Sequence, residues 1–187
     1  MLRSLFAKYK ASSDLNRFLI KGTLLFLAWR VFRKWMLLKG QYTAITQLGA
    51  TLYLKTSRFL LSLFGMDTVV DYGERKLWLV DASEAIEIVY DCLGINLFFV
   101  FFIFMLAYPG SLKIKSWFIP LGFLSIFLMN AARMAAMTIL VEKHPQHADF
   151  YHNFLFQALI YIGIFLMWML FVRLNSRKQK TEKQTHL

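Results

Sequence analysis

Residues 92–112 read CLGINLFFVFFIFMLAYPGSL, and from Leu93 to Leu112 this stretch contains no charged side chain. About 20 uncharged residues in an α-helix, at about 1.5 Å each, cover the ~30 Å hydrocarbon core of a bilayer. The Pro109-Gly110 pair predicts a turn at the end of the segment. The sequence therefore predicts a membrane-spanning helix that begins near Cys92, the only cysteine of the chain.

Two further stretches have the same character. Residues 116–141 contain one charge, Arg133, and residues 150–172 contain no Lys, Arg, Asp or Glu before a polar tail begins at Arg173. The whole chain of 187 residues is 58% hydrophobic, with a mean hydropathy of +0.48. This composition suits a protein surrounded by lipid and excludes an ordinary soluble domain.

The N-terminal third, residues 1–65, is expected to add helices to these three. Residues 43–65 are long enough to cross a membrane but carry Lys55 and Arg58, and residues 18–37 carry four cations. Either segment can be a tilted helix whose cations reach the lipid phosphates, and the earlier one can instead lie in the interface. The predicted fold class is an all-α polytopic membrane protein, a bundle of about four to five membrane helices.

Residues 66–91 interrupt the helical pattern and are acidic. Gly73 and the Asp81-Ala-Ser segment suit turns between short strands. Runs with strand-like composition or alternation lie at residues 68–70, 77–80 and 86–90. The sequence therefore predicts a small strand-containing cap outside the membrane that leads directly into Cys92.

The cations predict which side each segment faces. The net charge of +11 is concentrated at the two ends and in short connections, so it reads as a topology signal, and we expect no nucleic-acid partner. The tail, residues 173–187, should be cytoplasmic, which places residues 66–91 and 142–149 outside. The N-terminus is basic too, yet two N-terminal spans would place it outside. A single crossing or a re-entrant first helix would remove this conflict.

Three chemically reactive side chains are predicted to lie at a similar depth near the outer face. Cys92 begins one span, His152 begins another, and Arg133 lies ~12 Å along its helix from the outer end. Asn96 follows Cys92 by one turn and Asn130 precedes Arg133 by one turn, so each face carries a second polar group. A thiolate can attack an acyl carbon, an imidazole can exchange the proton, and a guanidinium can stabilise negative charge.

Each residue also has a plain structural interpretation. Cys92 alone would be a small packing residue, His152 alone an interfacial polar residue, and Arg133 can reach the outer phosphates and set helix depth. Only their shared depth favours catalysis. Histidines and carboxylates in the loop at residues 142–149 match no standard ligand spacing, so we expect a solvated loop, no metal and no cofactor.

Three short motifs, in this order, resemble those of the exosortase/archaeosortase family of multi-pass membrane transpeptidases. That family has a Cys-Ser-Gly-like motif at a helix start, an Asn-x-x-Arg-like motif in a later helix, and a His in the next helix. The matching stretches are Asp91-Cys92-Leu93-Gly94, Asn130-Ala-Ala-Arg133 and Tyr151-His152-Asn153. The resemblance covers roughly residues 66–172. Leu93 stands where the commoner motif has Ser, whereas the small Gly94 is kept and allows close backbone approach.

The resemblance implies a protein-sorting cysteine protease or transpeptidase of a bacterial cytoplasmic (inner) membrane, with its site at the outer face. Its substrates would be exported proteins that end in a short motif, a transmembrane helix and a basic cluster. Cys92 would form a thioester that an amine, on a lipid or another acceptor, resolves. Arg133 and His152 would complete the site, with Asn130, Asn96 and Gly94 supporting it; which of Arg133 and His152 activates the thiol stays open.

The rival interpretation is a non-enzymatic assembly factor or lipid-binding scaffold that grips phosphates. On either interpretation membrane lipids are partners. The chain is one membrane domain over residues 1–187, divided into N-terminal membrane or interfacial helices (1–65), an extracytoplasmic cap (66–91), a catalytic three-helix core (92–172) and a basic cytoplasmic tail (173–187).

Overall fold

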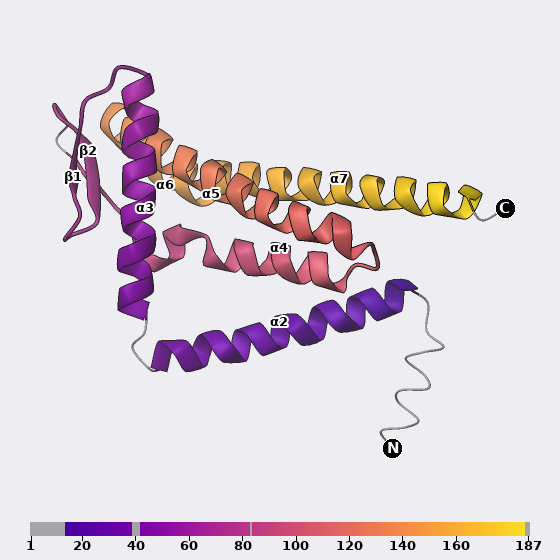
Figure 1. Ribbon diagram of the computed structural model, residues 1–187. Helices are drawn as coiled ribbons and strands as arrows, with labels where there is room; N and C mark the ends of the chain where they lie inside the picture. Colours follow the sequence, from indigo (N-terminus) through magenta and orange to yellow (C-terminus); the bar gives the residue numbers. More distant parts are fainter. Residues whose placement is uncertain (1–13, 39–41, 83, 186–187) are drawn as a thin grey trace.

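The computed structural model describes residues 14–38, 42–82 and 84–185. Most of the long helices run alongside one another, one lies across their end, and a small sheet lies beyond that crosswise helix (Figure 1). The helices are α2 (Asp14–Leu38), α3 (Tyr42–Leu63), α4 (Ile95–Ala107), α5 (Leu112–Lys143), α6 (Ala148–Phe150) and α7 (Phe156–Thr185). The strands are β1 (Thr68–Asp71), β2 (Lys76–Leu79) and β3 (Ile86–Glu87).

Three segments of the described residues are long and apolar enough to cross a membrane. They are Tyr90–Ala107, Leu112–Lys143 and Phe156–Ser176. The predicted class, a helical membrane protein with a small strand-containing cap, is confirmed. The helix of the third span continues through the polar tail as far as Thr185, which the sequence interpretation had not assigned to a helix.

Aromatic packing joins the three spans. Phe101 and Phe118 are almost fully buried between α4 and α5, and Phe171 of α7 packs against the Phe118 ring with centroids 5.3 Å apart. The absence of a side chain at Gly122 makes this approach possible, because a Cβ there would overlap the Phe101 ring. The spans therefore form a close-packed unit rather than three separate lipid-exposed helices.

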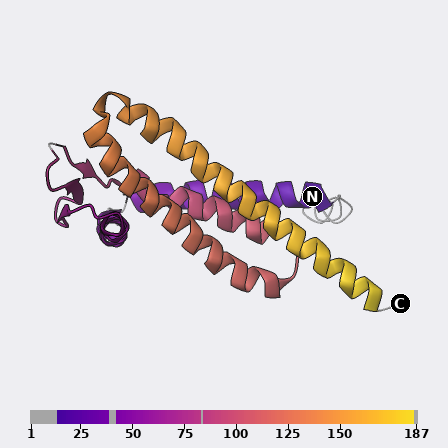
Figure 2. The ribbon, with the colours of Figure 1, turned by 90° about the horizontal axis from the view of Figure 1, so that it is seen from above.

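The two N-terminal helices take different directions. Helix α2 runs along α4, and its Trp29 ring stacks on Phe99 with centroids 3.3 Å apart. Helix α3 lies across the bundle end and is seen end-on in Figure 2, where the other helices run lengthwise. The sequence had suggested the earlier helix, residues 18–37, as the candidate for the interface; in the structure it is the later one that lies crosswise.

The first residues of α2 and the last residues of α7 lie at the same end of the bundle, opposite α3 and the sheet (Figure 1). If α2 crosses the membrane and α3 does not, as in the single-crossing alternative, Asp14 and the basic end of α7 lie on one side of the membrane.

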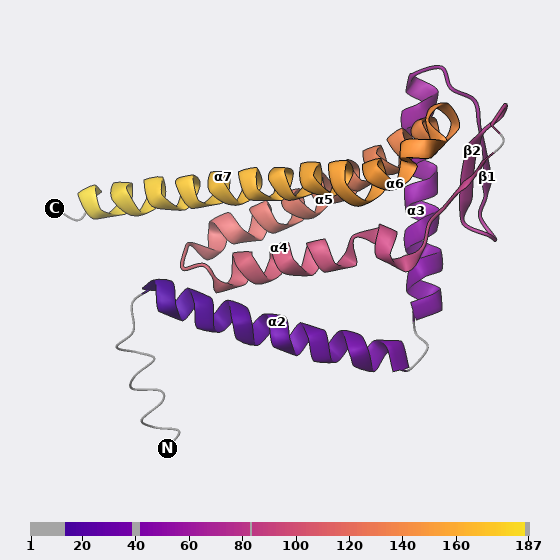
Figure 3. The same ribbon diagram turned by 180° about the vertical axis from the view of Figure 1, so that it is seen from behind.

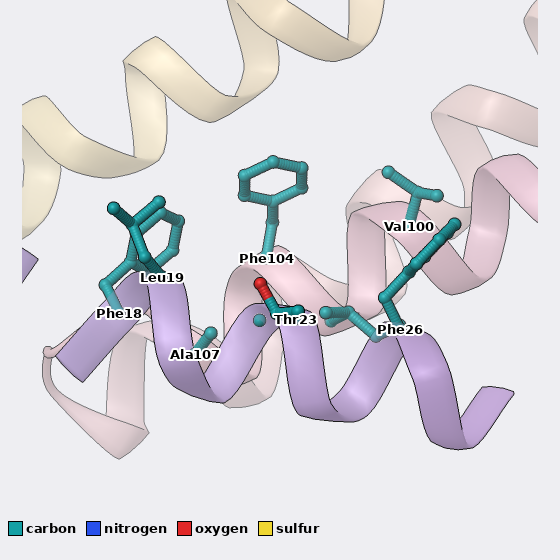
Figure 4. Close-up of a pocket in the computed structure, with 9 residues that line it drawn as sticks. Phe18, Leu19, Thr23, Phe26, Val100, Phe104 and Ala107 are labelled. Atoms are coloured by element: carbon teal, nitrogen blue, oxygen red, sulfur yellow. The ribbon is translucent and has the colours of Figure 1, made fainter. Parts of the chain in front are cut away.

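Between α2 and α4 lies an apolar groove of about 340 Å³ (Figure 4). Its lining side chains, none of them charged, include Phe18, Leu19, Phe26, Val100 and Phe104. An uncharged groove along a membrane helix suits apolar chains and does not suit a polar reaction.

The cap contains strands in all three predicted runs, although the third run is a strand only at Ile86–Glu87. They form an antiparallel sheet in the order β1-β2-β3. The carboxylate of Asp71 accepts the Gly73 and Glu74 amides at 2.8 and 3.0 Å, which closes the predicted turn. The sheet packs on α3 through fully buried Leu77 and Leu54 (Figure 3). Helix α3 is thus held between the sheet and one end of the spans.

A polar cluster fixes the opposite end of the bundle. Asn175 of α7 is buried, and its Oδ1 accepts the Ser111 amide at 3.1 Å. Buried Lys115 donates to the Tyr108 carbonyl at 2.7 Å, at the end of α4. A Cβ at Gly110 would overlap the Asn175 side chain, so the glycine is needed for this close approach.

Candidate functional site

Cys92 lies in a single 3-10 turn, Tyr90–Leu93, between the sheet and α4. Its amide donates to the Val89 carbonyl at 3.0 Å, and only 8% of the residue is exposed. Gly94 ends the turn with φ of +67°, a conformation that strongly favours glycine, and α4 begins at the next residue. The thiol is therefore held at the very start of a membrane helix, as the sequence predicted.

Two buried side chains hold the backbone of this turn. The Asn130 amide, 0% exposed, donates to the Cys92 carbonyl at 2.6 Å. The Tyr53 hydroxyl, on a residue 3% exposed, donates to the Leu93 carbonyl at 3.0 Å. Two consecutive carbonyls are thus satisfied from two different helices, α5 and α3. Since a Cβ at Gly94 would come within 3.2 Å of the Asn130 amide nitrogen, the glycine and the asparagine fit each other.

Sequence reasoning named Asn130 and Gly94 but missed Tyr53. The signal was present in residues 43–65, where small and polar residues recur at helical spacing among larger apolar ones. This stripe, which the structure buries, comprises Thr46, Ala50, Tyr53, Ser57 and Leu61.

The Cys92 sulfur lies 3.9 Å from Nε2 of His152. His152 is half-buried in a widened π-type turn, Tyr151–Leu155, that joins α6 to α7. Such turns are uncommon and often occur where a helix presents a functional group. At this distance the two atoms are at the outer limit of a hydrogen bond to sulfur, and a small shift brings them to proton-transfer distance.

Arg133 approaches the same histidine from α5. Its Nη2 donates to the His152 backbone carbonyl at 3.4 Å. The structure thus brings Cys92, His152 and Arg133 together from three spans, with His152 in contact with the other two. In the described part of the chain no carboxylate forms an ion pair with Arg133, so its charge remains available for negative charge nearby.

Arg133 also lines a mostly polar cleft of about 110 Å³ next to the turn. Gln157 and Tyr161 of α7, one helical turn apart, face this cleft and were not foreseen from the sequence. Other residues around the cleft are Tyr90, Asp91, Gly94, Ile95, Asn96, Leu97 and Ile160. The cleft borders the Cys92 turn at Tyr90, Asp91 and Gly94.

Asn96 lies at the edge of this cleft and not against the thiol. Its Oδ1 accepts Arg33 of α2 at 3.2 Å. Arg33 also lies 3.8 Å from the Asp91 carboxylate and 6.0 Å from the Tyr90 ring centroid. Arg33 therefore ties α2 to the cleft, a role that sequence reasoning did not assign to any residue of the N-terminal third.

Leu93 points away from the cleft. The residue is 2% exposed, and its methyl carbons would lie 3.1 and 3.2 Å from a Cβ at Gly49 of α3. Leucine at this position is accommodated because α3 has no side chain opposite it. The leucine that replaces the commoner serine at position 93 therefore affects the packing of the turn against α3.

Comparison with protein families gives a match to the family described as Transmembrane exosortase (Exosortase_EpsH), over residues 19–174. The chain belongs to the transmembrane exosortase family. The match runs from α2 to α7 and includes all the side chains around the thiol. It also includes α3 and most of α2, so this exosortase-family chain resembles the family over more of its length than the predicted residues 66–172. No curated protein and no solved structure gives a match.

Proposed function

We propose that this membrane protein is a protein-sorting cysteine transpeptidase that acts on exported proteins with a C-terminal motif, transmembrane helix and basic cluster. The observation that carries the proposal is the contact of one histidine with both other candidate residues. Nε2 of His152 lies 3.9 Å from the Cys92 sulfur, and the backbone carbonyl of His152 accepts a hydrogen bond from Nη2 of Arg133 at 3.4 Å. Membership of the exosortase family supports the same reaction class.

In the first half-reaction, Nε2 of His152 takes the thiol proton and the Cys92 sulfur attacks the carbonyl carbon of the scissile peptide bond. The oxyanion that forms is stabilised by the guanidinium of Arg133 at the cleft. The C–N bond then breaks, His152 returns its proton to the leaving amine, and the substrate remains as a thioester on Cys92. The released fragment is the membrane-anchoring tail.

In the second half-reaction an amine attacks the thioester carbonyl. His152 takes a proton from the attacking nitrogen, a new amide bond forms, and the C–S bond breaks. The proton passes back to the Cys92 sulfur, which regenerates the thiol. The acceptor amine belongs to a lipid or another surface component, and the chemistry needs neither a metal nor a cofactor.

We further propose that the reaction takes place at the outer face of a bacterial cytoplasmic membrane. The basic tail, residues 173–187, marks the opposite end of the bundle as cytoplasmic. The sheet of the acidic cap and the start of α4, which follows the Cys92 turn, lie at the far end from the last turns of α7 (Figure 1). An exported substrate anchored by its C-terminal helix presents its motif at this outer end.

The test is co-expression with a tailed substrate from the same organism, with processing followed by the change in substrate mass. Cys92→Ala and His152→Ala should leave the protein in the membrane and abolish processing. Arg133→Lys should lower processing at least about 100-fold, because an ammonium lacks the planar donor fork. The matched control is His147→Ala, which changes an exposed histidine outside the site. Full processing by Cys92→Ala would instead favour the non-enzymatic scaffold.

A further inference from the structure

We propose that α3 is a membrane-surface helix: it lies in the interface of the outer leaflet, with one apolar face in the lipid, and so sets the depth of Cys92. The position of α3 in the membrane can be tested whether or not the protein has the proposed activity. The effect of that position on substrate processing rests on the proposed function.

The first observation is an apolar face of α3 that the protein leaves uncovered. Five large side chains on this face are 38–68% exposed: Ile45, Leu48, Leu52, Phe59 and Leu63. At about 100° per residue, these positions fall on one side of the helix, roughly opposite the stripe that is buried against the bundle and sheet. Helix α3 therefore has two apolar faces, one buried in the protein and one exposed. A helix whose outer face contacts water would be expected to have a polar outer face.

The second observation is the direction of α3. It runs across the spans at one end of the bundle (Figures 1 and 2), where it contacts the Cys92 turn. Lipid chains that surround the spans cannot cover a helix along its whole length unless the helix lies flat in the interface. The lipid covering the spans continues directly onto such a helix.

The third observation is charge. Lys55 and Arg58 are exposed on α3 beside the apolar face. Cations at the border of an apolar stripe can reach lipid phosphates while the stripe lies in the acyl boundary. These two residues, which had argued against a membrane-crossing helix, fit a helix that lies on the membrane. The occupant of the apolar face is therefore a phospholipid leaflet.

The opposite face of α3 holds the site. Tyr53 donates to the Leu93 carbonyl at 3.0 Å, and Ser57 donates to the Ala131 carbonyl of α5 at 3.0 Å. Gly49 receives the Leu93 side chain. A helix that is anchored in the interface on one side and bonded to the catalytic turn on the other fixes the turn relative to the bilayer. This matters because the scissile bond of a tailed substrate is itself held at a depth set by a transmembrane helix.

The depth of α3 can be measured directly because the chain has one cysteine. In a Cys92→Ser background, an environment-sensitive fluorophore is attached at Leu48→Cys, Leu52→Cys or Phe59→Cys, with Ser62→Cys on the polar side as the matched control. The protein is placed in phosphatidylcholine–phosphatidylglycerol vesicles that contain phospholipid brominated at a shallow or a deep acyl position. Positions 48 and 59 lie about 16 Å apart along the helix.

We expect shallow bromines to quench all three apolar-face labels to the same extent, and the control label to be quenched little. A steady change of depth from position 48 to position 59 would mean that α3 crosses the membrane and would overturn the proposal. Absence of quenching at all three positions would overturn it too. In that case energy transfer between labelled copies would identify a second copy of the chain as the occupant.

The effect on the site is tested in the natural Cys92 background. Leu52→Glu places a charge in the apolar face and should lower processing roughly fivefold per membrane-inserted protein. Ser62→Glu places the same charge on the polar side and should not. Equal processing by both variants would show that the membrane position of α3 does not affect the site. If Leu52→Glu does not insert into the membrane, Leu52→Ser is used instead. If the wild type processes no tailed substrate, the proposed function fails, whereas the quenching result still decides the position of α3.

Discussion

Tyr53 and Asn130 satisfy the carbonyls of two consecutive residues, Cys92 and Leu93. A 3-10 turn that ends in a left-handed residue leaves such carbonyls without helix partners, and a buried carbonyl without a partner costs about 1–3 kcal/mol. Hydrogen bonds from side chains therefore determine where the thiol points. The Asn130 Oδ1 atom is buried and has no hydrogen-bond partner among the described residues, which is unfavourable for stability and supports a positioning role for Asn130.

Tyr53→Phe tests this positioning. The variant keeps the ring that stacks on Phe127 with centroids 4.7 Å apart, and it removes only the donor to the Leu93 carbonyl. We expect kcat for processing to fall roughly tenfold with KM little changed, because the thiol is less well oriented while the substrate cleft is intact. The measurement is steady-state processing per inserted protein.

Ser57→Ala is the matched control. It removes a buried hydroxyl on the same helix whose partner is the Ala131 carbonyl and not the Cys92 turn. Similar thermal destabilisation of both variants, with loss of kcat only in Tyr53→Phe, is expected. Equal loss of kcat in the two variants would show that Tyr53 acts only through general stability.

The same hydroxyl predicts a pH dependence. Burial raises the pKa of Tyr53 to about 12, and contact with the Asn130 side chain lowers it only in part. The unfolded chain releases this proton near pH 10, so the contribution of Tyr53 to stability is complete below pH 10 and is lost as the pH rises toward 12. The stability difference between wild type and Tyr53→Phe should therefore shrink between pH 10 and 12, as measured by thermal unfolding in detergent. A constant difference would contradict this.

At the scale of elements, the contact between α7 and the α4–α5 connection makes a separate prediction. Gly110→Ala introduces a Cβ that overlaps the Asn175 side chain and should lower the melting temperature in detergent, by the equivalent of about 1–3 kcal/mol. Adding Asn175→Ala removes the colliding atoms. If the overlap is the cause, the double variant should lose less stability than the sum of the two single variants.

The elements differ in how far the sequence could predict them. Three spans, three strands and the turn at Gly73 followed from uncharged length, alternation and turn residues, because each of these signals is local. The crosswise direction of α3 could not be predicted, since periodicity tells which face of a helix is apolar and not which way the helix points. The wide turn at Tyr151–Leu155 has no composition of its own and was likewise missed.

The candidate site shows the same division. Cys92, Arg133 and His152 were found because each breaks an otherwise uncharged or uniform stretch near a span end. Tyr53, Arg33 and the cleft residues of α7 were missed, because their roles depend on helices that pack side by side only in the folded chain. The periodicity of a mixed segment can show that a residue such as Tyr53 is on a buried face, but it does not show which group that residue contacts in the folded chain.

At the scale of the whole molecule, α2 runs alongside the spans, whereas α3 lies across one end of them (Figure 1). A crossing by α2 would add a fourth to the three candidate spans and would place Asp14 and Thr185 on one side of the membrane. It also explains why Arg33, near the end of α2, reaches the cleft: a helix that crosses beside α4 ends at the depth of the Cys92 turn.

The number of crossings can be tested with a membrane-impermeant maleimide on intact spheroplasts, using single cysteines in a Cys92→Ser background. Asp81→Cys in the cap should be labelled at once, whereas Asn16→Cys at the start of α2 and Ser176→Cys near the end of the third span should be labelled only after lysis. If Asn16→Cys is labelled in intact spheroplasts, the segment from α2 to α3 crosses the membrane twice or not at all, and a single crossing by α2 is wrong. If Ser176→Cys is labelled there and Asp81→Cys is not, the whole protein is inverted and Cys92 faces the cytoplasm.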